Sequence, residues 1–448
     1  MKPIKQELED RGLLYQNTND DVFALIDDGK SDFYCGFDPT ADSLHLGNFI
    51  GFMVATHIMR RGNTYTALTG GATGMIGDPG WKNSEREFLG MEALDKNQEA
   101  ISQQISEIAA NMKDFTGDDL KVEFINNKVF YENMNFLDFL REVGKYMTVN
   151  VMMGKDTVKK RIEDPSQSIS YTEFSYQLLQ GYDACRLFTE KNVILQIGGQ
   201  DQWGNLVTGT ELIRKKYDAD SFALTWPLIT DSSGKKFGKS EGNAMFLNKR
   251  KTSPYFIYQY FMNTADEDIS RFLKMLTLIE TEEIDTIVAD HMLKPEERAG
   301  QKLLAFKVVE IIHGTREAEL AEQITWFMFG SWDKVAELAQ LSTEDLETYQ
   351  NAMGGLDYSD ENFFEIIVKS GLAKSNSEAR NAVSSGAISI NGNKQYRYTL
   401  CGEGYLGQNS GTEMFGLGTA TAVDYVKVTW LNGAEDIFNN VSANQTLS

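Results

Sequence analysis

Short apolar runs that end in glycine alternate with helix-length amphipathic segments between residues 31 and 231. Residues 65–71 (Tyr-Thr-Ala-Leu-Thr-Gly-Gly) and 193–199 (Val-Ile-Leu-Gln-Ile-Gly-Gly) both show this pattern. The alternation is typical of a parallel sheet flanked by helices, so we expect an α/β fold with a Rossmann-like sheet. A ligand crevice is expected at the carboxyl ends of the strands, where Gly36 also falls.

The length and charge of the chain limit its organisation and its partners. At 448 residues it is too long for one ordinary core, which predicts roughly two to four domains. Its net charge of −22 repels nucleic acid on average, so an RNA partner has to meet a local basic patch. The candidates are residues 155–161, 214–216 and 249–251, although such runs are more often solvated helix faces.

The amino terminus and the cysteines indicate a cytoplasmic protein. The first ten residues mix both signs of charge and lack the apolar stretch of a secretory signal, and no apolar run is long enough for a membrane span. Cys35, Cys185 and Cys401 are widely spaced and form no Cys-x-x-Cys pair. We therefore expect reduced cysteines, no metal site and no membrane partner.

Changes of pattern divide the chain into five expected segments. A Rossmann-like domain covers 1–242, an α-helical domain 243–335, an acidic linker 336–360, a small α+β module 361–394, and a β-rich tail 395–448. In the module, residues 363–369 predict a helix and residues 387–392 a strand that ends in an Asn-Gly turn.

A strand end, a proline-set turn and a helix start follow one another at residues 38–48. Thr40 and His45 can donate to phosphate oxygens there, and Gly47 lets a base or phosphate approach the backbone. Residues 236–240 (Lys-Phe-Gly-Lys-Ser) form a twice-cationic loop that could close on the same phosphates. Together the two segments predict a nucleotide-activating site.

The glycine-rich residues 69–79 resemble the glycine turn of dinucleotide-binding reductases. The spacing is one residue too long, and the chain contains no Tyr-x-x-x-Lys, so a nicotinamide-dependent reductase is disfavoured. Asp78 then becomes a crevice carboxylate suited to an ammonium group, while Lys82 and Arg86 are suited to polyphosphate.

Tyr176, Gln180 and Asp183 follow one another at i, i+4 and i+7 among apolar residues, which predicts a polar-lined pocket as readily as an exposed helix face. Asp201 follows the glycine pair at 198–199, where an acid would bind ribose hydroxyls.

With these motifs, residues 1–393 resemble a bacterial-type tyrosyl-tRNA synthetase of the first synthetase class. The resemblance rests on residues 34–48, 70–78, 176–183, 198–205 and 236–240. It implies two steps, in which tyrosine is first activated with ATP and Mg²⁺ and then passed to the terminal ribose of tRNA(Tyr). It further implies a homodimer with Tyr171 near the interface, and an anticodon-side role for the helical domain.

The resemblance also implies a role for each site residue. The phenol of tyrosine would bind to Tyr34 and Asp183, and its ammonium group would bind to Asp78, Tyr176 and Gln180. The adenylate would be bound by Gly36, Asp38, Gly47, Gly199 and Asp201. The phosphates would be bound by Thr40, His45, Asn48, Lys82, Arg86, Lys236 and Lys239.

Three positions depart from the family pattern. Asn48 stands where a second histidine is common, although its amide can still donate to a phosphate or ring oxygen. Gln200 stands where serine is usual, and Gly51 presents no side chain toward the ribose. These departures bear on the rate of the reaction rather than on its identity.

The end of the chain departs further. Residues 363–394 resemble the ribosomal-protein-type RNA-binding module of these synthetases, whereas residues 404–433 resemble the ASPIC and UnbV type of repeat. A chimera joined near residues 392–395 and a divergent extension of the module both remain open. Residues 396–448 hold two basic residues against five acidic ones, a poor RNA surface. The alternative function is therefore an RNA-binding or regulatory protein impaired in tRNA charging.

Overall fold

The computed structural model describes residues 1–78, 90–164, 166, 168–234, 237–240, 243–329, 363–369, 373–384, 422–429 and 435–442. The chain divides into two compact units, Met1–Leu356 and Asp357–Ser448. None of the helices within the described ranges is long and apolar enough to cross a membrane.

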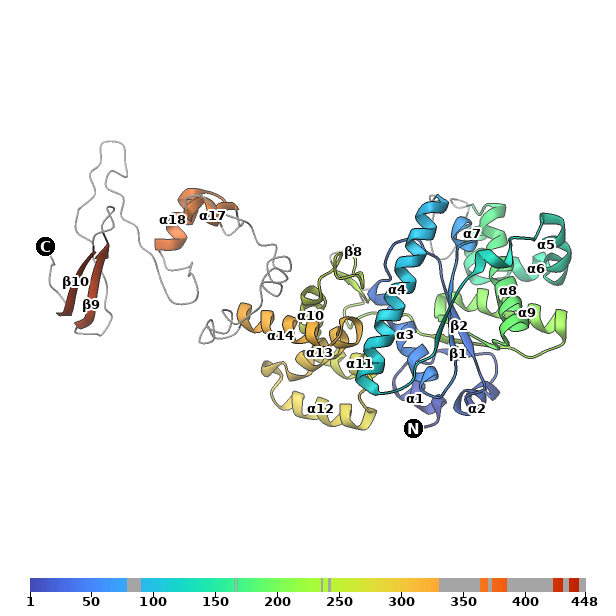
Figure 1. Cartoon of the computed structure of the whole chain (residues 1–448), viewed down its shortest axis with the longest axis horizontal. Coiled ribbons are helices and arrows are strands. Elements are labelled where there is room, and N and C mark those ends of the chain that lie inside the picture. Colours follow the sequence, from blue (N-terminus) through green and yellow to red (C-terminus); the bar gives the residue numbers. More distant parts are fainter. Residues whose placement is uncertain are drawn as a thin grey trace. The chain divides into compact units, whose positions relative to one another are not determined.

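A six-stranded sheet forms the centre of the first unit, in the order β1-β6-β5-β2-β3-β4 (Figure 1). Five strands run parallel, and the short β1 pairs antiparallel with β6 at one edge. The strands are β1 (Gln16–Asn17), β2 (Phe33–Phe37), β3 (Tyr65–Thr69), β4 (Val122–Asn126), β5 (Leu195–Gly199) and β6 (Phe222–Trp226). The α/β expectation is therefore confirmed.

The order of strands reverses between β2 and β5. From β2 the chain adds β3 and then β4 on one side, and it later adds β5 and then β6 on the other side. Such a reversal opens a crevice at the carboxyl ends of the two central strands, because their connections leave to opposite sides.

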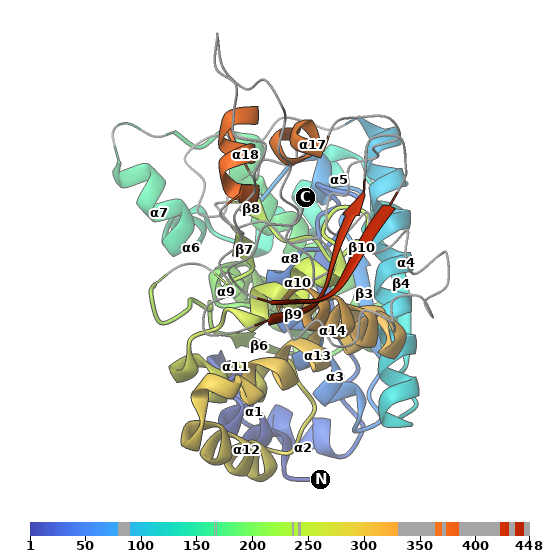
Figure 2. The same ribbon diagram turned by 90° about the vertical axis from the view of Figure 1, so that its left-hand side faces the viewer.

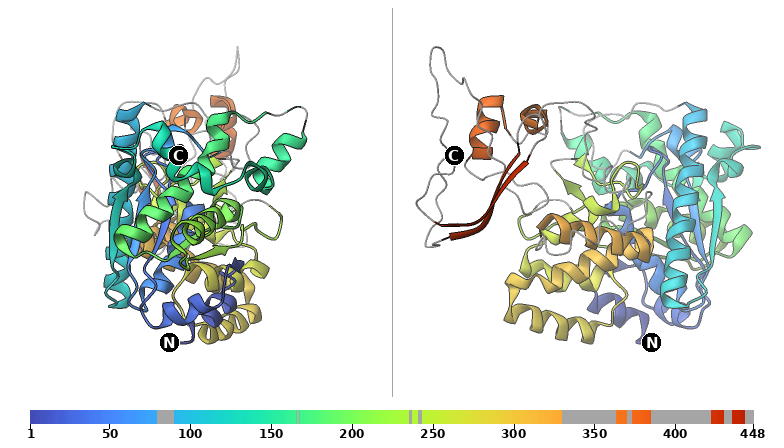
Figure 3. Two further views of the ribbon diagram at one scale, coloured as in Figure 1. Left: turned by 90° about the vertical axis from the view of Figure 1, so that its right-hand side faces the viewer. Right: turned by 60° about the vertical axis from the view of Figure 1, so that its left-hand side comes forward.

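Two apolar cores cover the two faces of the sheet. Alternation along β2 sends Phe33 and Cys35 into the core that holds helix α3 (Leu46–Met59), and Tyr34 into the core that holds helix α8 (Tyr171–Lys191). Cys35 and Cys185 are buried free thiols, as expected from the sequence. Figure 3 shows α8 and α9 (Trp203–Tyr217), in green, side by side.

Further helices surround these layers. They are α1 (Ile4–Asp10), α2 (Asp21–Asp27), α4 (Met91–Thr116), α5 (Phe136–Glu142), α6 (Val149–Met153) and α7 (Asp156–Glu163), with short 3₁₀ turns at Thr73–Met75, Asn127–Phe130, Gly144–Tyr146, Gln200–Gln202 and Pro295–Glu297.

Local capping fixes the start of α8, which carries part of the pocket. The Ser170 hydroxyl accepts from the Glu173 amide at 3.2 Å, and Glu173 also forms a buried ion pair with Arg161 at 2.8 Å. The helix ends at Asn192, whose φ of 55° is the left-handed conformation that terminates helices.

Within the segment 243–335, which the sequence predicts to be helical, the described residues from 254 to 329 form helices. These helices are α10 (Pro254–Met262), α11 (Asp266–Leu276), α12 (Thr281–Leu293), α13 (Ala299–His313) and α14 (Thr315–Phe329), preceded by the small hairpin β7 (Lys239–Ser240) and β8 (Asn243–Ala244). Figure 2 shows α10, α13 and α14 packed together.

Arg11 ties the amino-terminal helix to this helical part. Its guanidinium is fully buried and donates to the carbonyls of Lys274, Thr277 and Ile279 at 2.9–3.0 Å. Glu7 balances its charge, as an ion pair one helical turn away. The buried guanidinium is thus held by acceptors that come from distant sequence as well as by its own helix.

The second unit contains α17 (Phe363–Lys369), α18 (Asn376–Ser384) and a hairpin of β9 (Ala422–Thr429) with β10 (Glu435–Ser442). The helix expected at 363–369 and the capping residue Ser375, which accepts from the Glu378 amide at 3.2 Å, are both present. The strand expected at 387–392 and Cys401 lie outside the described residues.

Candidate active site

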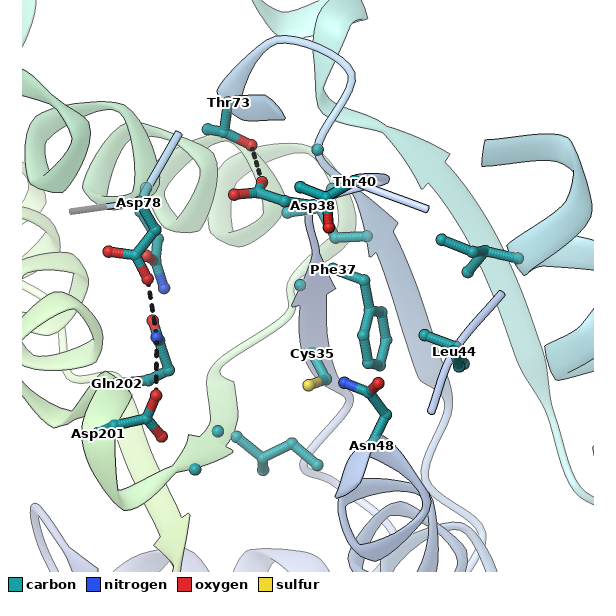
Figure 4. Close-up of a pocket in the computed structure, with 18 of the residues that line it drawn as sticks. Cys35, Phe37, Asp38, Thr40, Leu44, Asn48, Thr73, Asp78, Asp201 and Gln202 are labelled. Atoms are coloured by element: carbon teal, nitrogen blue, oxygen red, sulfur yellow. Dashed lines mark hydrogen bonds between the residues drawn. The ribbon is translucent and has the colours of Figure 1, made fainter. Parts of the chain in front are cut away.

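A crevice of about 490 Å³ opens where the order of the strands reverses. Its walls come from the ends of β2, β5 and β6, the start of α3 and one face of α8. Figure 4 shows polar side chains from the turns that follow β2, β3 and β5 around it.

The start of α3 forms one end of the crevice. His45 is the exposed residue that precedes the helix, and its backbone amide donates to the Asn48 side-chain oxygen at 3.0 Å. Asn48 therefore caps the helix with its oxygen, which leaves its amide hydrogens for another acceptor. Gly47 lies in the same turn and lines the crevice. The amides of Leu46 and Asn48 donate to the carbonyls of Met245 and His45, and the positive end of the helix dipole still favours an anion here.

The loop of residues 236–240 contacts α3 at this end of the crevice. A Cβ built on Gly238, whose φ is +75°, would lie 3.1 Å from the Gly47 nitrogen, so the two backbones are in direct contact. Phe237 anchors the loop in a cluster with Tyr260, Phe261 and Phe272. The structure thus brings the two motifs together, although Lys236 and the side chain of Lys239 lie outside the described residues.

Asp183 lies buried at the opposite end. Asn127 donates to its Oδ2 at 2.9 Å and Tyr131 to its Oδ1 at 2.8 Å. Burial raises the pKa of this carboxyl to about 7, and the two donors oppose the shift. Tyr34 lines the same end, and burial together with the Asp183 charge raises its pKa well above the usual value. Its hydroxyl has no hydrogen-bond partner among the described residues.

Asp38 joins three elements at the centre. Its carboxylate accepts from Thr73 at 2.8 Å (Figure 4). It also accepts from Tyr176 at 2.9 Å, so it links the end of β2 to the turn after β3 and to α8. Burial, followed by the charges of Asp38 and Asp78, raises the pKa of Tyr176, so its hydroxyl remains a donor at neutral pH.

Gln202 bridges two further carboxylates. Its side-chain nitrogen donates to Asp78 at 2.8 Å and lies 3.4 Å from Asp201 (Figure 4). Gln180 of α8 lines the crevice as well, and its buried oxygen has no hydrogen-bond partner in the described part of the chain. The central region therefore presents several carboxylates and amide oxygens, groups that attract an ammonium ion.

Most residues singled out from the sequence line this crevice. They are Tyr34, Gly36, Asp38, Thr40, His45, Gly47, Asn48, Asp78, Tyr176, Gln180, Asp183, Gly199 and Asp201. Lys82 and Arg86, like Lys236, lie outside the described residues. Gln200, one of the departures, accepts from the Leu228 amide at 3.4 Å.

Sequence reasoning missed several residues of the site, including Thr73, Asn127, Tyr131 and Gln202. Asn127 follows the edge strand β4, in which no residue is fully buried and burial does not alternate along the strand. Gln202 follows Asp201 in the turn after β5, so its position at a strand end is the signal that could have found it.

Comparison with protein-family models gives three matches along the chain. A model described as tRNA synthetases class I (W and Y) matches residues 27–330. A model described as Tyrosine--tRNA ligase SYY-like C-terminal domain matches residues 337–401, and one described as ASPIC and UnbV matches residues 374–448. The last two matches overlap at residues 374–401.

Individual proteins give the same result. The chain is 44% identical over 397 residues to "Tyrosine--tRNA ligase" of Streptococcus pneumoniae (strain 70585), which covers 87% of this chain and 92% of that protein. It is 43% identical over 405 residues to "Tyrosine--tRNA ligase" of Streptococcus gordonii (strain Challis), and this match covers 89% of this chain and 94% of that protein. The chain also superposes on a solved structure, that of a C-terminally truncated mitochondrial tyrosyl-tRNA synthetase of Aspergillus nidulans, with a TM-score of 0.66 and 30% identity. This superposition covers 73% of this chain and 95% of that one.

Proposed function

Because the chain belongs to the tyrosine–tRNA ligases of the class I tRNA synthetase family, we propose that its crevice carries out both the activation of tyrosine and the transfer to tRNA. The observation that carries this proposal is the closed end of the crevice, where the Tyr34 hydroxyl and the Asp183 carboxylate are both buried. The matches to tyrosine–tRNA ligases over most of the chain do not favour a regulatory protein that has lost tRNA charging.

Tyrosine enters with its phenol toward this closed end. The phenol hydroxyl donates to Asp183 and accepts from Tyr34, so the buried Tyr34 hydroxyl gains the partner it lacks and Asp183 gains a third donor beside Asn127 and Tyr131. Phenylalanine would leave the Tyr34 hydroxyl unpaired and would give Asp183 no donor in exchange for the water it displaces, which costs binding energy. At the other end of the amino acid, the ammonium group binds to Asp78, Tyr176 and Gln180.

ATP occupies the half of the crevice next to α3. Gly36, Asp38, Gly47, Gly199 and Asp201 surround the nucleoside, and the phosphates lie at the start of α3 near Thr40, His45 and Asn48. Lys82, Arg86, Lys236 and Lys239 supply cationic groups for the phosphates. This arrangement follows from the short distance between the α3 start and Gly238.

In the first reaction the tyrosine carboxylate attacks the α-phosphorus of ATP. A new bond forms between the carboxylate oxygen and that phosphorus, and the bond to the bridging oxygen breaks to release pyrophosphate. The carboxylate is already ionised at neutral pH, so no general base is needed. Catalysis comes from positioning the reactants and from stabilising the charge on the phosphates.

Mg²⁺ enters as part of the ATP substrate. The described residues contain no group of three or more His, Cys, Asp or Glu side chains suited to a metal ion, so we expect the phosphates to supply most of its ligands. It neutralises phosphate charge during the attack.

In the second reaction a ribose hydroxyl at the end of tRNA(Tyr) takes the tyrosyl group from the adenylate and AMP leaves. We propose the boundaries expected from the sequence: 1–242 for catalysis, 243–335 for the anticodon side, 336–360 as a linker, 361–394 for RNA binding, and 395–448 as an atypical tail. The match of residues 337–401 to a ligase C-terminal domain supports the RNA-binding module.

We expect a homodimer in the cytoplasm. Large apolar side chains lie exposed on α5, α6 and the start of α8, among them Phe136 (62%), Leu137 (74%) and Tyr171 (66%). A second copy of the chain would cover such a surface, which is unusual for a monomer.

The test is tyrosine-dependent exchange of pyrophosphate into ATP, followed by charging of tRNA(Tyr). We expect the purified chain to catalyse pyrophosphate exchange and tRNA charging with tyrosine, and to catalyse neither reaction with phenylalanine. A folded chain without exchange would overturn the proposal. Exchange without charging would restrict the activity to the first reaction.

A further inference from the structure

Trp226 occupies the space beside Gly51 of α3, the helix whose start borders the nucleotide half of the crevice. A Cβ built on Gly51 would lie 2.6 Å from Cη2 and 2.7 Å from Cζ2 of the indole, closer than Cβ atoms approach in folded proteins. The absence of a side chain at Gly51 therefore leaves no gap, because the indole fills it. Any larger residue at position 51 has to displace the ring.

The indole reaches across the wall of the crevice. Trp226 is the last residue of β6 and pairs in register with Gly199, the last residue of β5. Its Nε1 lies 3.7 Å from a Cβ built on Gly199, and the same Cβ would lie 2.6 Å from an Asp201 oxygen. One edge of the ring thus faces α3, and the other faces the turn that carries Asp201.

Burial of Trp226 is incomplete. The ring packs on the core that contains α3, yet the residue remains partly exposed and lines the crevice together with Gly47 and Gly199. An indole face is flat and polarisable, and nucleobases stack on such faces. Gly47 and Gly199 contribute only backbone to this part of the wall, and Leu228 and Phe246 add further apolar surface to the crevice.

We propose that Trp226 forms the wall against which the adenosine part of ATP lies, and that Gly51 is required because it seats the indole there. The proposal rests on the assignment of this half of the crevice to ATP. Trp226 is in this view a specificity residue for the nucleotide, and Gly51 acts only through it.

The experiment measures KM for ATP and for tyrosine separately by pyrophosphate exchange. Trp226→Leu should raise KM for ATP on the order of tenfold, as expected for the loss of one stacking partner, with KM for tyrosine nearly unchanged. Gly51→Ala should have the same selective effect. The KM for ATP of the double variant should be no higher than that of Trp226→Leu alone, because the smaller leucine side chain leaves room for the added methyl group.

Gly300→Ala provides the matched control. Its added Cβ would lie 2.7 Å from Ile269, a similar overlap in a helix away from the crevice. It should lower the melting temperature without changing KM for ATP. A loss of ATP affinity in Gly300→Ala equal to that in Gly51→Ala would overturn the proposal, since the effect would then report destabilisation.

A second readout uses the ring itself. Adding ATP alone should change the tryptophan emission of the wild type, and Trp226→Phe should lose that change. An unchanged KM for ATP in a folded Trp226→Leu variant, with exchange intact in the wild type, would refute the inference alone. Absence of exchange in the wild type would instead refute the proposed function.

Discussion

The Tyr131 hydroxyl donates to the Asp183 carboxylate at the closed end of the crevice. The Tyr131 oxygen lies 2.8 Å from Asp183 Oδ1 and 3.0 Å from the Leu179 carbonyl oxygen, and a phenol has a single hydrogen to donate. The hydroxyl can donate to Asp183 when the carboxylate is charged, and to Leu179 when Asp183 is itself protonated. The charge on Asp183 therefore decides how this network is oriented.

Tyr131→Phe should change the pH dependence of tyrosine use. Removing the donor destabilises the charged carboxylate, so the pKa of Asp183 rises above its value of about 7. The acid limb of kcat/KM for tyrosine should move to higher pH, with about a tenfold loss near neutrality, the worth of one hydrogen bond to a charged group. The variant leaves the neighbouring groups Asp38, Tyr34 and Tyr176 in place, so a shift of the acid limb would result from the loss of the Tyr131 hydroxyl. An equal loss at every pH would indicate a purely structural role.

Asp183→Asn should stabilise the fold while reducing activity. The unfolded carboxyl loses its proton near pH 3.8 and the folded one near 7, so the wild type loses stability as pH rises between these values. Above them the penalty reaches at most roughly 4 kcal/mol. The variant should melt higher than the wild type at about pH 8, and the gap should narrow toward pH 4 and close below it, where the carboxyl is protonated in both the folded and the unfolded state. A gap that does not depend on pH would contradict this explanation.

Gly238→Ala should impair tyrosine activation through contact with α3. Gly238 and Gly234 both have φ near +80°, so alanine strains the backbone at either position by about 1 kcal/mol. Among the described residues, the Cβ at 238 meets the start of α3, at 3.1 Å from the Gly47 nitrogen, whereas the Cβ at 234 meets no atom within 4 Å. We expect exchange to fall at least about tenfold for Gly238→Ala and to change little for Gly234→Ala. Equal losses in the two variants would show that backbone strain alone matters.

Leu137→Glu should weaken the dimer. Leu137 is 74% exposed on α5, and a carboxylate there would be buried without a partner in an apolar interface. Sedimentation should show monomers at concentrations where the wild type is dimeric. Leu293→Glu is the control, because Leu293 is 80% exposed at the end of α12 and outside the proposed interface. Dimers of unchanged affinity in Leu137→Glu would place the interface elsewhere.

Removing residues 396–448 should leave pyrophosphate exchange unchanged and should not weaken tRNA binding. The segment holds five acidic residues against Arg397 and Lys427, so it repels rather than attracts a polyanion. Filter binding of tRNA(Tyr) to the full and the shortened chain measures the difference. Weaker binding after truncation would assign the tail a direct role in RNA recognition.

Local signals in the sequence predicted much of the fold and of the crevice. Glycines at or just after the ends of β2, β3 and β5 marked the strand ends, and the spacing from Tyr176 to Asp183 indicated one polar helix face. These signals are local because each depends on residues within a few positions of one another.

The rest depends on contacts between distant residues. Trp226 fills the space beside Gly51, and neither neighbourhood in the sequence contains a sign of the other. Tyr131 and Asn127 reach Asp183 from the end of an edge strand along which burial does not alternate. Tertiary packing, rather than propensity, positions these side chains.

The buried Arg11 sets an order of events during synthesis. Its three carbonyl acceptors lie 263, 266 and 268 residues further along the chain. At translation rates of about 5–20 residues per second, the ribosome needs on the order of tens of seconds to supply them. Until then the guanidinium must remain hydrated, so the first helix to be made is among the last to be locked in place.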